Sequence, residues 1–193
     1  MSRDKRVGIL GGTFNPPHMG HIALAGAAIR ELKLDKVVFI PAFAPPHKEV
    51  KDNDAAARYE MTRLACEGDP RFEVSDIEIN NRSVSYSVDT LKVMRKKYGQ
   101  DAELFFIIGS DSVEELESWK DISEAMGLAK FIAGIRPGFP VKDLKRAVSV
   151  IEMPARDISS SMIRDYVRAG RPINGLVPGP VFDFITTHKL YKA

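Results

Sequence analysis

The chain has 193 residues and a formal net charge of +2, because 28 lysine and arginine residues face 26 aspartate and glutamate residues. This balance argues against a dedicated nucleic-acid-binding protein, which would carry a large basic excess. With 44% hydrophobic and 28% charged residues, the composition is that of an ordinary globular protein and excludes a disordered or fibrous chain. The length predicts one domain.

Cys66 is the only cysteine, which excludes an internal disulfide framework and any CxxC metal or redox motif. We expect it to be a small buried hydrophobic residue. The segment of residues 1–6, which carries a net positive charge, is followed by an apolar stretch too short for a secretory signal, and no stretch has the length of a membrane helix. These features predict a soluble protein of the cytoplasm.

Short β-rich runs alternate with longer stretches of helix-forming composition. Several of the runs are apolar throughout, as expected for strands buried on both faces of a parallel sheet. Strands are predicted at residues 7–10, 36–40, 72–74, 104–108, 130–133 and 147–151. Helices are predicted at residues 21–33, 54–67, 87–98, 112–119 and 159–169, with glycines at 99 and 170 where two of them would end.

This alternation indicates βαβ units. We therefore predict an α/β fold, a Rossmann-like doubly wound and mostly parallel sheet with helices on both faces. No linker divides the chain, so residues 1–193 are expected to form one domain with residues 159–193 as a C-terminal helical part. In such sheets ligands bind outside the carboxyl ends of the strands.

The densest motif is residues 8–21, which runs from the first strand through a turn into a helix. Gly11 and Gly12 allow the backbone to approach a ligand, and the helix beginning near His18 aims its amino end at the same place. This arrangement predicts an anion site. The spacing is neither the GxGxxG dinucleotide fingerprint nor a P-loop.

His18 and His21 are three residues apart, so both imidazoles are expected on one side of a first helical turn, where Gly20 leaves space. There they could donate hydrogen bonds to phosphate oxygens, although a pair of solvated or capping histidines has the same spacing. A zinc site would need a third ligand, and we predict no metal ligand from protein side chains.

Residues 12–21 resemble the HxGH signature of the nucleotidyltransferase superfamily, in the form found in bacterial nicotinate-nucleotide adenylyltransferases. Residues 158–164, read as ISSSMIR, are similar to the ISSTxIR motif of that family. Physically they form a serine-rich cap with an arginine one turn into a helix, able to reach a polyphosphate. Further resemblances lie at residues 41–48, 85–91, 106–111 and 136–138, so the matches run from residue 7 to 164, about four fifths of the chain.

The sequence also departs from the family pattern at four places. Ser87 and Ser161 replace threonines and keep the hydroxyl, Asn15 stands where others have aspartate, and Lys120 follows Trp119 where many members have tyrosine. The roles of Asn15 and of the Lys120 side chain are therefore left open.

The resemblance implies adenylyl transfer from ATP to nicotinate mononucleotide, a step of NAD biosynthesis, with Mg²⁺ carried by the substrate. The implied catalytic residues are His18, His21 and Arg164. The implied ATP-binding residues are Gly11, Gly12, Thr13, Phe14, Gly109, Asp111, Arg136, Ile158, Ser159, Ser160 and Ser161. The implied mononucleotide-binding residues are Asn15, His47, Lys48, Ser87, Trp119 and Lys120.

Alternatives are the same chemistry on nicotinamide mononucleotide or phosphopantetheine, or a non-catalytic nucleotide-binding protein. The expected partners are small-molecule substrates, without nucleic acid or membrane, and homo-oligomerisation is left open.

Overall fold

The structure is a computed structural model and describes residues 5–45, 55–135, 148–153 and 157–192, except the side chain of Asp111. Within these ranges six strands form one parallel sheet in the order β3-β2-β1-β4-β5-β6. They are β1 (Arg6–Gly12), β2 (Lys36–Pro41), β3 (Phe72–Val74), β4 (Glu103–Gly109), β5 (Lys130–Ile135) and β6 (Val148–Glu152). The predicted parallel, doubly wound sheet is confirmed, because the strand order reverses at β1 and β4.

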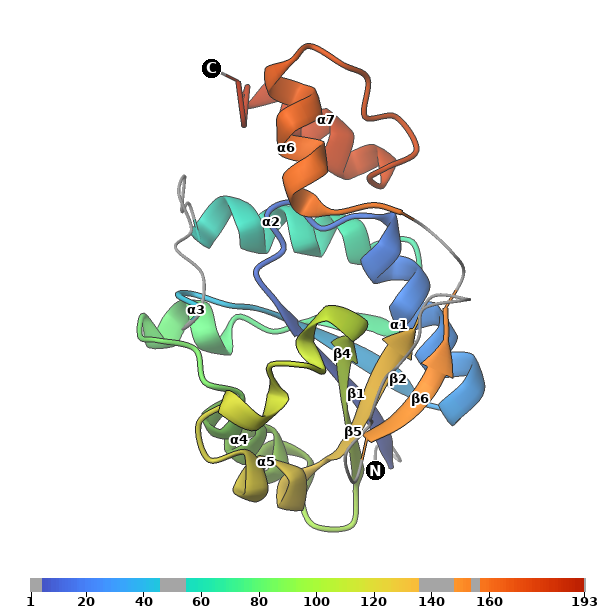
Figure 1. The fold of residues 1–193 in the computed structure, drawn as a ribbon, viewed down its shortest axis with the longest axis vertical. Coiled ribbons are helices and arrows are strands. Elements are labelled where there is room, and N and C mark those ends of the chain that lie inside the picture. Colours follow the sequence, from blue (N-terminus) through green and yellow to red (C-terminus); the bar gives the residue numbers. More distant parts are fainter. Residues whose placement is uncertain (1–4, 46–54, 136–147, 154–156, 193) are drawn as a thin grey trace.

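The helices alternate with these strands (Figure 1). They are α1 (Met19–Leu32), α2 (Ala55–Cys66), α3 (Ile77–Asn81), α4 (Ser87–Tyr98), α5 (Ile122–Leu128), α6 (Ser160–Arg168) and α7 (Gly179–Thr187). The predicted helix at residues 112–119 is wrong. That segment holds two short 3₁₀ turns, Ser110–Ser112 and Leu116–Ser118, and the Ser118 hydroxyl donates to the carbonyl of Glu115 at 2.6 Å. Such a local bond competes with a regular helical ladder.

The two faces of the sheet bury different helices. In β1, Val7 and Ile9 belong to the cluster that includes residues of α4 and α5, whereas Leu10 packs into the cluster of α1. This follows from the two-residue period of a strand. Cys66 lies in the second cluster as predicted, and burial raises the pKa of its thiol to about 12.

A third cluster joins the C-terminal helices to α2. Ile163 of α6 and Val181 of α7 are completely buried and cluster with Met61 of α2. In Figure 1, α6 and α7 (orange to red) lie above α2, beyond the end toward which the strands point. The C-terminal part therefore lies beyond the carboxyl ends of the strands, the end of the sheet at which ligands of such folds bind.

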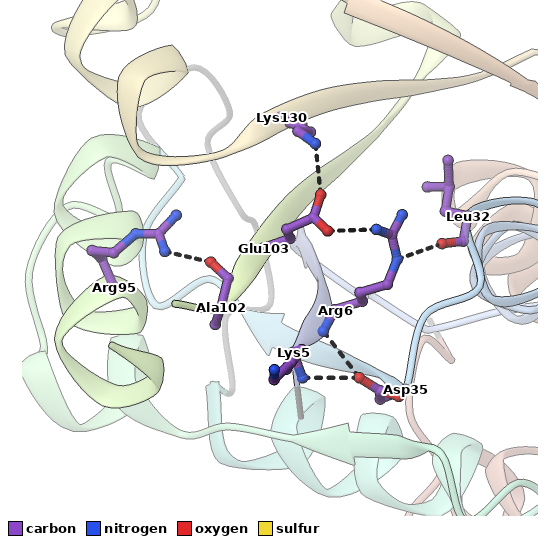
Figure 2. Close-up of polar contacts among 8 residues, drawn as sticks. All are labelled: Lys5, Arg6, Leu32, Asp35, Arg95, Ala102, Glu103 and Lys130. Carbon is purple, nitrogen blue, oxygen red and sulfur yellow. Dashed lines mark hydrogen bonds and ion pairs between the residues drawn. The ribbon is translucent and has the colours of Figure 1, made fainter. Parts of the chain in front are cut away.

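Ionic contacts lie at the opposite end of the sheet, at the amino ends of its strands (Figure 2). The Glu103 carboxylate lies 2.5 Å from Arg6 Nη1 and 2.6 Å from Lys130 Nζ, and these cations hold its pKa below the ordinary value. Asp35 accepts the backbone N–H groups of Lys5 and Arg6. These contacts are largely exposed, so they align the amino ends of β1, β4 and β5 more than they stabilise the fold.

Among the described residues, no helix combines the length and the apolar character needed to span a membrane.

Candidate active site

The turn between β1 and α1 is compact because a phenyl ring occupies the space beside a glycine. A Cβ on Gly12 would lie 3.0 Å from the ring of Phe14, so a larger residue there would require the ring to shift. Phe14 itself has φ 49°, in the left-handed region, and is 2% exposed. A non-glycine residue in that region costs about 1–3 kcal/mol, which the surrounding structure must offset. The Phe14 ring also meets the His21 ring edge-on, with centroids 5.0 Å apart.

The two histidines of the first motif lie together at the amino end of α1. Their rings stack with centroids 3.7 Å apart, and a Cβ on Gly20 would approach the His18 ring to 3.0 Å. The backbone N–H of His18 donates to His21 Nδ1 at 3.1 Å. Because that nitrogen accepts, the neutral ring of His21 carries its proton on Nε2. Burial, followed by the nearby His18, holds the pKa of His21 well below its ordinary value.

The second motif contacts the same turn. Ser159 caps α6, as predicted, by accepting the backbone N–H of Met162. The Ser160 hydroxyl donates to the carbonyl of Pro16 at 2.8 Å, across 144 positions of the sequence. Arg164 donates through Nη1 to the carbonyl of Asn15 at 2.7 Å and through Nη2 to the Ser161 hydroxyl at 3.1 Å. The fold thus brings the two motifs together, with Arg164 beside the histidine turn.

Sequence reasoning missed a buried arginine behind this turn. Arg58 of α2 is 1% exposed and donates to the carbonyl of Thr13 at 2.7 Å and to that of Phe43 at 3.1 Å. It therefore ties the turn after β1 to the segment after β2. Arg58 also acts on Glu78, a carboxyl whose pKa is raised chiefly by burial. No sequence signal separates Arg58 from a surface arginine, because α2 carries several charged residues.

A cleft of about 210 Å³ opens at the carboxyl ends of β1 and β4. Residues expected to bind ATP and residues expected to bind the mononucleotide both line it. Those lining residues are Gly11, Gly12, Thr13, Gly109, Ser87, Trp119 and Lys120. Glu78 and Tyr86, which the motifs did not single out, line it as well. His18, His21 and Arg164 do not line this cleft, and the Phe14 ring lies between Gly12 and His21.

Trp119 and Tyr86 line the far wall of the cleft. Trp119 is half-buried and meets Phe106 of β4 edge-on, with centroids 6.1 Å apart and an interplanar angle of 84°. Lys120 Nζ lies 4.4 Å from the centroid of the Tyr86 ring and 3.5 Å from the Asp89 carboxylate. The indole thus presents a flat apolar wall, whereas the ammonium group is held by neighbouring side chains.

The remaining predicted site residues can be placed only in part. Asn15 is 6% exposed and Ile158 is 8% exposed, so both are buried beside the turn. His47, Lys48 and Arg136 lie outside the described residues, and so does the side chain of Asp111. Within the described part of the chain, no three His, Cys, Asp or Glu residues gather as a metal site.

Comparisons with known proteins agree with this architecture. The family described as cytidylyltransferase-like matches residues 9–166. A "probable nicotinate-nucleotide adenylyltransferase" of Moorella thermoacetica is 41% identical over 100% of this chain and 94% of its own length. The protein of the same description from Thermus thermophilus is 42% identical over 97% of this chain and 100% of its own length.

Solved structures share the fold. Plasmodium falciparum nicotinic acid mononucleotide adenylyltransferase, complexed with NaAD, superposes with a TM-score of 0.81 at 19% identity, covering 97% of both chains. At that identity the likeness concerns the fold, while the curated relatives carry the family assignment. The chain belongs to the cytidylyltransferase-like family and, within it, to the nicotinate-nucleotide adenylyltransferases.

Proposed function

We propose that the chain transfers the adenylyl group of ATP to nicotinate mononucleotide, giving nicotinate adenine dinucleotide and pyrophosphate. The observation that carries this proposal is the cleft, where the glycine turn of β1 faces Trp119 and the amino end of α4. The names of the relatives, and the NaAD complex of the Plasmodium protein, support the same substrates. ATP binding and a place in NAD biosynthesis follow from this proposal. A cytoplasmic setting and the absence of nucleic-acid or membrane partners stay predictions.

In this reaction a phosphate oxygen of the mononucleotide attacks the α-phosphorus of ATP. The bond from that phosphorus to the bridging oxygen breaks, and pyrophosphate leaves with the electron pair. The attacking oxygen is already anionic at neutral pH, so the chain needs no general base. Its task is alignment and stabilisation of charge. We assign this to His18 and His21, because the tautomer of His21 leaves a proton on Nε2 as a donor.

Arg164 and the serines of α6 are proposed to hold the leaving pyrophosphate. Two of the five N–H donors of Arg164 are used in contacts with Asn15 and Ser161, so the guanidinium keeps donors for phosphate oxygens. Mg²⁺ bound to the phosphates of ATP would supply further charge neutralisation. We assign no protein ligand to it.

We propose that backbone amides select nicotinate over nicotinamide. Ser87 is the first residue of α4, where helix N–H groups lack partners within the helix and favour an anion. The Lys120 side chain is instead held by Tyr86 and Asp89. An amide NH₂ facing backbone donors would leave both unpaired, which costs about 1–3 kcal/mol per lost bond and predicts at least a tenfold preference.

The test is product identification by mass after the protein is mixed with ATP, Mg²⁺ and nicotinate mononucleotide, nicotinamide mononucleotide or phosphopantetheine. We expect nicotinate adenine dinucleotide, with kcat/KM at least tenfold above that for nicotinamide mononucleotide. Equal values would overturn the substrate assignment, and absence of any product would favour a nucleotide-binding protein. Lys120→Ala should keep most of the preference, whereas Trp119→Ala should weaken both pyridine substrates through lost stacking.

The role of α6 is tested by Arg164→Ala against Arg168→Ala on the same helix. Arg168 is exposed and pairs with Asp165, so its removal should leave the kinetics unchanged. Arg164→Ala should weaken ATP binding or turnover and spare affinity for the mononucleotide. An effect confined to the mononucleotide would assign this helix to the other substrate.

A further inference from the structure

A tyrosine far from the histidine motif in sequence reaches its turn. The Tyr191 hydroxyl donates to Asn15 Oδ1 at 2.6 Å, across 176 positions of the sequence. The chain turns sharply to bring it there, because Lys189 and Tyr191 follow α7 with φ 52° and 62°. The backbone N–H of Leu190 donates to the carbonyl of Ile185 at 3.0 Å and closes that turn.

Asn15 is the residue where the contacts of this turn converge. Its backbone carbonyl accepts from Arg164, and its side-chain oxygen accepts from Tyr191. It is 6% exposed and directly follows Phe14, whose φ of 49° requires support from its surroundings. His18 lies only three residues after Asn15, so a displacement of Asn15 would also move the stacked imidazoles.

The contact with Tyr191 also gives a structural context for Asn15, which stands where other members of the family have aspartate. An asparagine oxygen accepts a hydrogen bond from a tyrosine hydroxyl as a carboxylate oxygen would, but it adds no negative charge beside the turn. The neutral side chain thus keeps the hydrogen bond without a buried negative charge beside the turn.

We propose that Tyr191 is a positioning residue for adenylyl transfer, acting through Asn15 to hold the histidine turn in its productive geometry. The inference rests on the proposed function for its kinetic consequence, although the contact itself does not. The segment after α7 would then contribute to catalysis, although Tyr191 itself does not touch substrate.

Tyr191→Phe removes only the hydroxyl and keeps the ring, so it tests the contact directly. We expect kcat to fall about three- to tenfold, with KM for both substrates within twofold, because the loss of one hydrogen bond displaces groups that act in the transition state. Tyr166→Phe is the matched control, since that ring lies on α6 under the guanidinium of Arg171 at 3.7 Å. It should keep the wild-type kcat.

A double-mutant cycle separates positioning from general stability. Asn15→Ala should lower kcat, and adding Tyr191→Phe should lower it no further, because both remove the same contact. Fully additive losses, or a wild-type kcat in Tyr191→Phe, would overturn the proposal.

Hydrogen exchange of the peptide covering residues 13–21 provides a readout that needs no activity. Tyr191→Phe should speed exchange there, and Tyr166→Phe should not. Unchanged exchange in Tyr191→Phe would also overturn the proposal. An inactive wild-type protein whose exchange still responds to Tyr191→Phe would instead overturn the proposed function.

Discussion

The stacked rings of His18 and His21 constrain each other's charge. With centroids 3.7 Å apart, two imidazolium ions would repel strongly, and the backbone N–H of His18 already requires an unprotonated Nδ1 on His21. The neutral ring of His21 therefore carries its proton on Nε2. In the proposed mechanism, such a ring would donate to an anionic substrate without relying on a positive charge.

His21→Ala removes both this donor and the acceptor for the His18 N–H. We expect kcat to fall about a hundredfold or more, since the loss of one preorganised donor to a transition state costs about 2.7–4 kcal/mol. His188→Ala is the control, because that histidine is exposed at the end of α7 and stacks on Phe184. Near-normal kcat in a folded His21→Ala protein would remove His21 from the mechanism.

The lowered pKa of His21 has a defined effect on stability. The unfolded chain takes up a proton near pH 6.5, whereas the native ring stays neutral to lower pH. The stabilising contribution is therefore complete above pH 6.5 and is lost as the pH falls from there toward the native pKa. Urea unfolding between pH 8 and 5 should show a smaller loss of stability in His21→Ala than in wild type. Parallel curves would contradict a lowered pKa.

At the scale of elements, α2 carries two arginines with opposite roles. Arg58 is buried and bridges the carbonyls of Thr13 and Phe43, whereas Arg63 is exposed and pairs with Glu60 and Glu67. Arg58→Met leaves two carbonyls without this donor, which should lower the free energy of unfolding by about 2–6 kcal/mol. Arg63→Ala should have little measurable effect. Urea denaturation of both variants checks this, and similar midpoints would show that Arg58 does not hold the turn.

Most strands could be predicted because buried parallel strands are continuous apolar runs, as in residues 104–108, which fall within β4. Residues 72–74 were also predicted with the same bounds as β3, although this strand is only partly buried and contains Glu73. The short helices α3 and α5 were not predicted, because five and seven residues are too few to display a helical period. Residues 112–119 have a helical composition, but the Ser118 hydroxyl bond to Glu115 favours a tight turn.

The candidate site could be predicted where a motif is continuous, as in residues 8–21. Ser160 and Arg164 were predicted as site residues from the second motif, but their contacts with the turn and the whole contribution of Tyr191 were not, because these contacts join distant segments. Ser160, Arg164 and Tyr191 reach the turn from positions at least 144 residues away. Such contacts depend on how α6 and α7 pack on α2, which no local pattern in the sequence encodes.

At the scale of the whole molecule, the C-terminal helices share their core with α2. Ile163 and Val181 are fully buried, and their cluster includes Met61 and Ala65 of α2. We propose on this basis that residues 159–193 unfold together with the sheet as one cooperative unit. Trp119, the only tryptophan, reports on the other side of the molecule through its contact with Phe106.

Ile163→Ala tests whether the C-terminal part and the sheet unfold as one cooperative unit. Deleting a buried aliphatic side chain should cost about 2–5 kcal/mol, and in a single unit the whole loss appears in the transition followed by Trp119 fluorescence. Val93→Ala on α4 is the control, because Val93 is 49% exposed and its loss should leave the midpoint unchanged. If the C-terminal part unfolded independently, the Trp119 transition would stay at the wild-type urea concentration while far-UV circular dichroism showed an earlier loss of helix. Coincident, shifted transitions by both probes are the expected result, because α2 transmits the lost packing to the sheet.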